Sequence, residues 1–321
     1  MSFGNTNKDL YTVKLSISTN LTPQESIEVG DWRFEMSVVD GREILRGIIK
    51  IESEEYKGIM PPVVSQALDE VEVPLTALAF CLDGVFRVNP HEMEVLSSKV
   101  RLPKILFYDD FRHSAFGRTF KQEECKYIEK INEIIKNYEI LKRLFTYYKL
   151  GINLSFRYYN PPEAFLNFYK VIEQISWIIC DEYDPEFKVK KEKEINDTAR
   201  EILNERRLDD PRHGDEIKIG RIKNLINKFI SQKEIKARDQ VEFACEKLKL
   251  SDEIETTKRL VDIRNRWDVA HSSREEQKEL LEELRDCRNI ARKFILRYLV
   301  IHNILEPESY SDLMQVPSGV Y

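Results

Sequence analysis

VDIRNRWDVAHSS, residues Val261–Ser273, decides which fold the second half of the chain is predicted to have. In and just before it, apolar residues recur at steps of three and four positions, which predicts one apolar stripe on an α-helix. These residues are Leu260, Ile263, Trp267 and Ala270. Ser273 and Glu276 then have the spacing of a helix capping box. The stretch therefore predicts the end of one amphipathic helix, a short break and the start of another.

Three ionisable side chains lie along the border of this stripe. Arg264 and His271 are seven positions apart, nearly two helical turns, so both project from the same side of the helix. Asp268 lies between them, and Asn265 follows Arg264 but points about 100° away from it. Arg264 and His271 are thus the candidate catalytic pair, with Asn265 and Asp268 as supporting residues.

The order Arg264-Asn265, five further residues and then His271 resembles the signature of HEPN domains, and of their ApeA-like branch in particular. Residues 164–175, AFLNFYKVIEQI, resemble the opening core helix of many members. The resemblance implies an all-α up-and-down helical bundle. It also implies a metal-independent ribonuclease without cofactors, whose site forms where two copies of the domain meet.

The same Arg/His spacing occurs twice more in the chain. Arg297 and His302 have four residues between them, and Arg207 and His213 have five. A proline interrupts the second pair, and a tyrosine follows the arginine of the first where Asn265 follows Arg264. Neither pair has the Asn after the arginine, the Ala-His ending or the helix-break-helix setting of Arg264 and His271, and we expect the Arg297/His302 pair to be inert.

RNA cleavage without a metal needs a base for the 2′-hydroxyl, an acid for the leaving 5′-oxygen and positive charge for the phosphorane. The ordinary pKa of histidine, about 6.5, lets His271 take or give a proton at cellular pH. Arginine keeps its charge and meets phosphate through two parallel hydrogen bonds, which suits Arg264. We expect Asp268 to hold one of the pair in place, and Asn265 to orient the site or contact the partner subunit. The resemblance implies a 2′,3′-cyclic phosphate and a 5′-hydroxyl as products.

Ordinary structural roles also account for these residues. A histidine in the last turn of a helix is favoured by the helix dipole, and Arg264 with Asp268 four positions later is a common surface pair worth about 0.2–0.5 kcal/mol. Trp267 is then simply a core residue. Two other functions stay open: a non-catalytic HEPN-like module that binds RNA, nucleotide or a protein partner, and an accessory protein whose helices only mediate assembly.

The chain has 321 residues and a formal net charge of −6, enough length for two domains. Residues 1–118 contain 13 Lys/Arg and 18 Asp/Glu, and residues 119–321 contain 37 and 38. Because neither part is basic overall, any contact with RNA must be local. Five cysteines without a CxxC pair argue for a reducing compartment and against a zinc site. No apolar run reaches the ~18 residues of a membrane span, so we expect no membrane contact and a cytoplasmic location.

Residues 1–118 show the two-residue alternation of half-buried strands. It is clearest in Tyr11–Ile17 and Trp32–Val38. Asp83-Gly84 between two largely apolar segments predicts a β-hairpin, and Pro61-Pro62 opens a short helix. No phosphate-binding glycine loop, metal cluster or nucleophile motif occurs here. The role of this β-rich domain therefore stays unassigned, beyond sensing for or restraining the helices.

Residues 119–321 are predicted to be helical. Four main helices are expected to start at the caps Thr119, Asn160, Asp252 and Ser273 and to end near Leu150, Cys180, Ala270 and Leu305. A charged insertion at about 184–250 carries shorter helices near 190–206, 216–231 and 238–249. Its lysines at 188–193 form the most basic cluster of the chain, where a contact with RNA stays open, but we expect a solvated helix start. For Glu173 a place facing the site stays open, but we expect an exposed surface glutamate. We expect the tail after Pro307 to be loose.

The sequence thus predicts an α+β protein with a β-rich domain of unknown role in residues 1–118 and a HEPN-like helical domain in residues 119–321. The expected function is a metal-independent endoribonuclease of the toxin or phage-defence kind. Its expected partners are RNA, as substrate, and a second copy bound through the helical domain. The sequence does not identify an antitoxin or regulatory partner.

Overall fold

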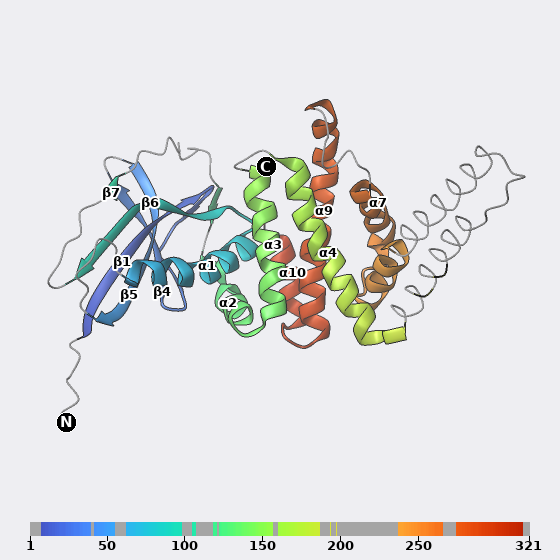
Figure 1. Ribbon diagram of the computed structural model, residues 1–321, viewed down its shortest axis with the longest axis horizontal. Coiled ribbons are helices and arrows are strands. Elements are labelled where there is room, and N and C mark those ends of the chain that lie inside the picture. Colours follow the sequence, from blue (N-terminus) through green and yellow to red (C-terminus); the bar gives the residue numbers. More distant parts are fainter. Residues whose placement is uncertain are drawn as a thin grey trace, which may run out of the picture. The chain divides into compact units, whose positions relative to one another are not determined.

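Strands gather in the N-terminal part of the chain and helices in the rest, so the protein is α+β, as predicted (Figure 1). The chain forms two units, Met1–Asn160 with Pro307–Tyr321, and Pro161–Glu306. We call them the sheet unit and the helical unit. The computed structural model describes residues 8–39, 42–54, 62–97, 105–106, 118–120, 122–156, 160–186, 193, 197, 237–265 and 274–316.

The sheet unit contains a six-stranded antiparallel sheet in the order β3-β4-β5-β1-β6-β7. Its strands are β1 (Lys8–Thr19), β3 (Ile27–Val29), β4 (Trp32–Val39), β5 (Arg42–Glu54), β6 (Phe86–Ser97) and β7 (Ile105–Leu106). A separate parallel pair joins β2 (Leu21–Pro23) to β8 (Arg118–Phe120). The strands predicted at Tyr11–Ile17 and Trp32–Val38 are confirmed, and Val13, Leu15 and Phe34 are fully buried in the core.

Helix α1 (Pro62–Leu82) packs on β1, β5 and β6, and is far longer than the short helix predicted. The hairpin predicted at Asp83-Gly84 is wrong, because residues 79–82 are the last turn of α1 and only the segment after the turn is a strand. Asp83 has a φ of 49°, and the Gly84 N–H donates to the Ala79 carbonyl at 3.2 Å. That bond closes a Schellman helix end. An Asp-Gly pair supplies a left-handed residue to a helix end as readily as to a hairpin.

The long helix predicted from Thr119 to about Leu150 is two helices. Thr119 lies in β8, and the short 3₁₀ helix η1 (Gln122–Cys125) follows. Helices α2 (Ile128–Asn137) and α3 (Glu139–Phe156) are separated at Tyr138, whose extended backbone (φ −125°, ψ 100°) interrupts the helical path. Both helices pack on α1. The units consequently divide after Asn160, whereas the sequence analysis placed the boundary after residue 118.

The segment after Pro307 is not the loose tail that was predicted. Residues Pro307–Gln315 form helix α10, which belongs to the sheet unit. Its Leu313 and Ser309 are each 1 % exposed, so one face of the helix is buried. Burial of that leucine explains why a short polar segment is ordered.

In the described part of the helical unit, three helices lie side by side (Figure 1). They are α4 (Pro161–Tyr183), α7 (Ile254–Asn265) and α9 (Arg274–Ile301), joined by a helix at 237–247 and the 3₁₀ turn η2 (Ser251–Glu253). The predicted starts after Asn160 and Ser273 are confirmed, and so is the helix near 238–249. The helices predicted near 190–206 and 216–231 lie outside the described residues, apart from Lys193 and Asp197.

Helix α9 ends earlier than the predicted Leu305. Asn303 adopts a φ of 55°, and the Ile304 N–H donates to the Leu299 carbonyl at 2.8 Å. These are again the features of a Schellman end, which Asn tolerates better than most residues. His302 is left at the helix terminus, where it becomes part of a polar cluster described below.

Candidate functional site

Arg264 lies in the last turn of α7, and Asn265 is the final residue of that helix. The preceding turn anchors it, because Leu260, Val261 and Ile263 are buried with 5 % exposure or less. The Arg264 side chain itself is 43 % exposed. The apolar stripe predicted from the sequence thus faces the core as far as Ile263, and Arg264 lies at its border.

Three groups hold the Arg264 guanidinium. Its Nη2 donates to Glu173 Oε1 of α4 at 3.3 Å, and its Nη1 donates to Asn265 Oδ1 at 3.0 Å. Its Cζ lies 5.7 Å from the centre of the Tyr169 ring, within the range of a cation–π contact. The side chain is therefore solvent-accessible and also fixed from several directions.

Tyr169 is the buried ring over which the Arg264 guanidinium lies. Only 2 % of the residue is exposed, and it stacks with Phe165 at a ring distance of 6.2 Å. Burial, followed by the negative charge of Glu173, raises the pKa of the Tyr169 hydroxyl, and Arg264 opposes the shift only in part. Tyr169 therefore stays neutral at physiological pH and serves as an aromatic support.

Two further arginine–carboxylate pairs lie around α7. Arg238 forms a two-point pair with Asp262, with Nε donating to Oδ1 at 2.8 Å, and Arg259 pairs with Asp286 of α9. Both are exposed pairs of the kind that contributes little to stability. They show that an arginine–carboxylate contact alone does not single out a site. The buried aromatic ring and the neighbouring Asn265 distinguish Arg264.

Of the four candidate site residues, the structure describes Arg264 and Asn265. It brings Arg264 and Asn265 together with Glu173, which the sequence analysis had set aside as a surface glutamate, and with Tyr169, which it had not considered. Asp268 and His271 lie outside the described residues. Tyr169 and Glu173 are four positions apart on one helix, so their shared face was readable from the sequence. Their position beside Arg264 was not.

The alternative pair, Arg297 and His302, lies in a different setting. His302 Nε2 is 3.1 Å from Glu182 Oε2, and the Tyr298 hydroxyl donates to the other Glu182 oxygen at 3.2 Å. The Tyr298 and His302 rings lie 4.3 Å apart. Burial and then Glu182 raise the pKa of Tyr298 to about 12. The cluster connects the end of α9 to α4. This structural role explains why these polar residues occur here, without a catalytic role.

None of the five cysteine thiols is poised as a nucleophile. All five are free, and four of them are buried. Burial is the main cause that raises the pKa of Cys125 to about 11, of Cys245 to about 11 and of Cys180 to about 12, and it also holds Cys287 protonated. Since only the thiolate attacks, burial disfavours these four thiols as nucleophiles at neutral pH.

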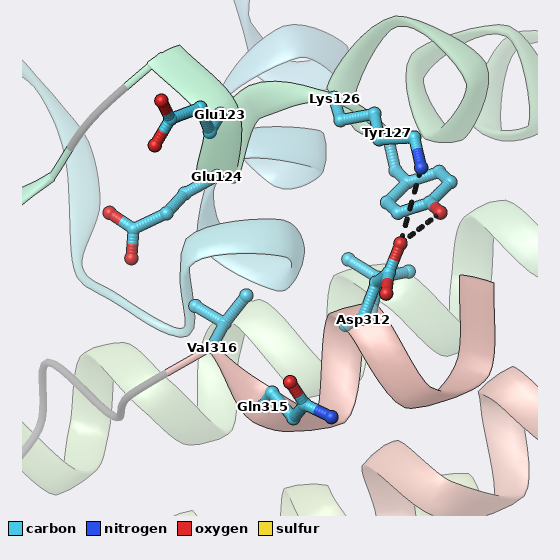
Figure 2. Close-up of a pocket in the computed structure, with 8 residues that line it drawn as sticks. Glu123, Glu124, Lys126, Tyr127, Asp312, Gln315 and Val316 are labelled. Atoms are coloured by element: carbon cyan, nitrogen blue, oxygen red, sulfur yellow. Dashed lines mark hydrogen bonds and ion pairs between the residues drawn. The ribbon is translucent and has the colours of Figure 1, made fainter. Parts of the chain in front are cut away.

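A cavity of about 260 Å³ lies in the sheet unit between η1 and α10 (Figure 2). It is lined by Glu123, Glu124, Lys126, Tyr127, Asp312, Leu313, Gln315 and Val316. Lys126 and Tyr127 point toward Asp312, and the Tyr127 hydroxyl donates to its carboxylate at 2.5 Å (Figure 2). Glu124 is held by Arg118 at 2.5 Å. Lys126, Tyr127 and Asp312 bond one another and Glu124 pairs with Arg118. The cavity therefore borders a helix-docking contact rather than a convergent ligand site.

Within the described ranges, no three His, Cys, Asp or Glu side chains are grouped so as to hold a metal ion. Among the same residues, no helix has the length and apolarity needed to cross a membrane. No family model, curated protein or solved structure matches the chain.

Proposed function

We propose that the chain is a metal-independent endoribonuclease of the toxin or phage-defence kind, cutting RNA at a site that contains Arg264 and His271. The observation that carries the proposal is the state of Arg264: its side chain is 43 % exposed, yet a buried ring, a carboxylate and an amide hold the guanidinium. A cation that is accessible and preorganised suits the charge that develops on a phosphorane. The Arg-Asn-x5-His order supports the same conclusion.

In this proposal His271 moves the proton. It takes the proton of the 2′-hydroxyl, whose oxygen attacks the adjacent phosphorus, and the 5′-oxygen leaves with a proton from a second acid. The bond from phosphorus to the 5′-oxygen breaks as the bond to the 2′-oxygen forms. The products are a 2′,3′-cyclic phosphate and a 5′-hydroxyl. Arg264 binds the non-bridging oxygens throughout, and Asp268 and Asn265 orient the pair.

A homodimer supplies the second acid. Two copies related by a two-fold axis through the helical unit bring two Arg264 and two His271 side chains to one cleft. One histidine then acts as base and the other as acid. The sheet unit is left free to sense a trigger or restrain the nuclease, and the protein acts in the cytoplasm, where its RNA substrate is found.

The test is an RNA cleavage assay on the purified chain with three variants. Arg264→Ala and His271→Ala should each abolish cleavage. Arg259→Ala, which removes another arginine of α7 with its own carboxylate partner, should retain it. RNA that is bound but not cut by the wild type would favour a non-catalytic binding module. Neither binding nor cutting would favour an accessory role, and either result would refute the proposal.

A further inference from the structure

We infer that Glu173 is a positioning residue for Arg264: its carboxylate sets the direction of the guanidinium that the proposed function assigns to the phosphate. The inference rests on that proposed function and extends it to a residue outside the Arg-Asn-x5-His motif. Helix α4, which contacts Arg264 through Glu173 and Tyr169, thereby takes part in the reaction.

The close packing of α4 makes Glu173 suited to this task. Both neighbours in the preceding turn, Val171 and Ile172, are completely buried, as is Ile175 after it. Glu173 follows Tyr169 by four positions, so its side chain lies above the ring that supports Arg264. A carboxylate and an aromatic ring thus reach one guanidinium from one face of the same helix.

The hydrogen bonds leave room for a phosphate. A guanidinium has five N–H donors, of which Glu173 and Asn265 take one each. Glu173 binds Nη2 through a single oxygen, and within the described residues no other hydrogen bond takes a further donor, which leaves donors for the non-bridging oxygens of the substrate. Glu173 therefore need not leave when RNA binds. This distinguishes a positioning role from that of a carboxylate that competes with phosphate.

A positioning role and a competing role for Glu173 predict different kinetics. Loss of a positioning contact lets Arg264 sample several rotamers, which weakens the interaction made in the transition state and lowers kcat. Binding of RNA is spread over many backbone contacts, so KM should change little. Loss of a competitor would instead lower KM and leave kcat intact.

The experiment measures kcat and KM for RNA cleavage by Glu173→Ala, Glu173→Gln and Glu173→Asp. We expect Glu173→Ala to lower kcat by about ten- to a hundredfold, with KM within about twofold of the wild type. Glu173→Gln keeps an acceptor oxygen at the same reach and should recover most of the rate. Glu173→Asp is one methylene shorter and should not.

The matched control is Asp286→Asn, which disrupts the exposed pair with Arg259 on the same helix α7. It should leave both kinetic constants unchanged. If Arg264→Ala loses cleavage while Glu173→Ala keeps the full kcat or lowers KM, the positioning inference alone is overturned. If the wild type does not cut RNA, or Arg264→Ala cuts it normally, the proposed function fails and the inference falls with it.

Discussion

Arg264 and Glu173 are 91 positions apart in the sequence, and their side chains meet at 3.3 Å where α7 passes α4. Both are partly exposed, at 43 % and 35 %. A pair in that environment contributes at most about 1 kcal/mol to folding. The stability of the fold therefore depends little on this pair.

Replacing Arg264 should separate activity from folding. We expect Arg264→Ala to lower the free energy of unfolding by less than about 1 kcal/mol while abolishing RNA cleavage. Urea denaturation followed by circular dichroism measures the first effect, and a cleavage assay the second. If the variant unfolds in the absence of urea, Arg264 has a structural role. Its loss of activity would then no longer support a catalytic role.

The Arg297/His302 pair should be dispensable for cleavage. Tyr298 donates to Glu182, and His302 Nε2 lies 3.1 Å from the same carboxylate, so His302→Ala is expected to loosen the end of α9 and to leave kcat near the wild-type value. Arg297→Ala should likewise leave kcat near the wild-type value. Comparison of cleavage rates with melting temperatures checks this. A folded His302→Ala protein without activity would mean that the motif was assigned to the wrong histidine.

Tyr148→Phe should destabilise the protein more than its small change in volume suggests. The Tyr148 hydroxyl donates to Asp83 Oδ1 at 2.8 Å, and both residues are buried at the end of α1. Removing the hydroxyl leaves a buried carboxylate without that donor, at a cost of about 1–3 kcal/mol. Tyr138→Phe, at a tyrosine that is 48 % exposed, is the control and should be neutral. Equal stabilities of the two variants in guanidinium denaturation would contradict the account of this helix end.

Docking of α10 should depend on pH through Asp312. The hydrogen bond from Tyr127, followed by that from Lys126, lowers the pKa of Asp312 below its ordinary value of 3.8. A lowered carboxyl pKa stabilises the folded form above that ordinary value, and this stabilisation is lost as the pH falls through the lowered pKa. Asp312→Asn should therefore reduce hydrogen-exchange protection in α10 at neutral pH but have no effect in strong acid.

Glu308→Gln is the control for this prediction, because it removes a carboxylate from the exposed first turn of the same helix. It should leave the protection of residues 309–315 unchanged. Asp312→Asn with wild-type protection at neutral pH would contradict the assignment of Asp312 as the anchor of α10.

The sequence predicted those elements whose pattern is local. The strands at Tyr11–Ile17 and Trp32–Val38 and the helix beginning after Asn160 each have a clear period or cap, and each is confirmed. The end of α1 was mistaken for a hairpin for a physical reason. Residues 74–86 are all buried, so no exposed face remains to produce a helical period. The Asp-Gly pair then dominated the interpretation.

Tertiary contacts account for the other differences. Helices α2 and α3 have amphipathic patterns that fit a helical bundle, but they cover α1 of the sheet unit instead. The segment Pro307–Gln315 is polar on average, and its order depends on Leu313 and on the contacts of Asp312 with residues far back in the chain. Periodicity shows that a face will be buried and does not show what buries it.

In the candidate site too, local patterns were predictable from the sequence and tertiary contacts were not. The border position of Arg264 followed from the spacing of Leu260 and Ile263, and it is confirmed. Glu173 and Tyr169 lie on another helix, so their contact with Arg264 is a product of folding that no local pattern contains. The parts of His271 and Asp268 stay predictions.

The most direct measurement is the chemistry of RNA ends produced by the wild-type chain in the presence of EDTA, determined by mass spectrometry and compared with the His271→Ala protein. The account predicts a 2′,3′-cyclic phosphate and a 5′-hydroxyl from the wild type, unaffected by the chelator, and no cleavage by the variant or at positions carrying a 2′-deoxyribose. Loss of cleavage in EDTA, a 5′-phosphate product, or full activity of His271→Ala would contradict it.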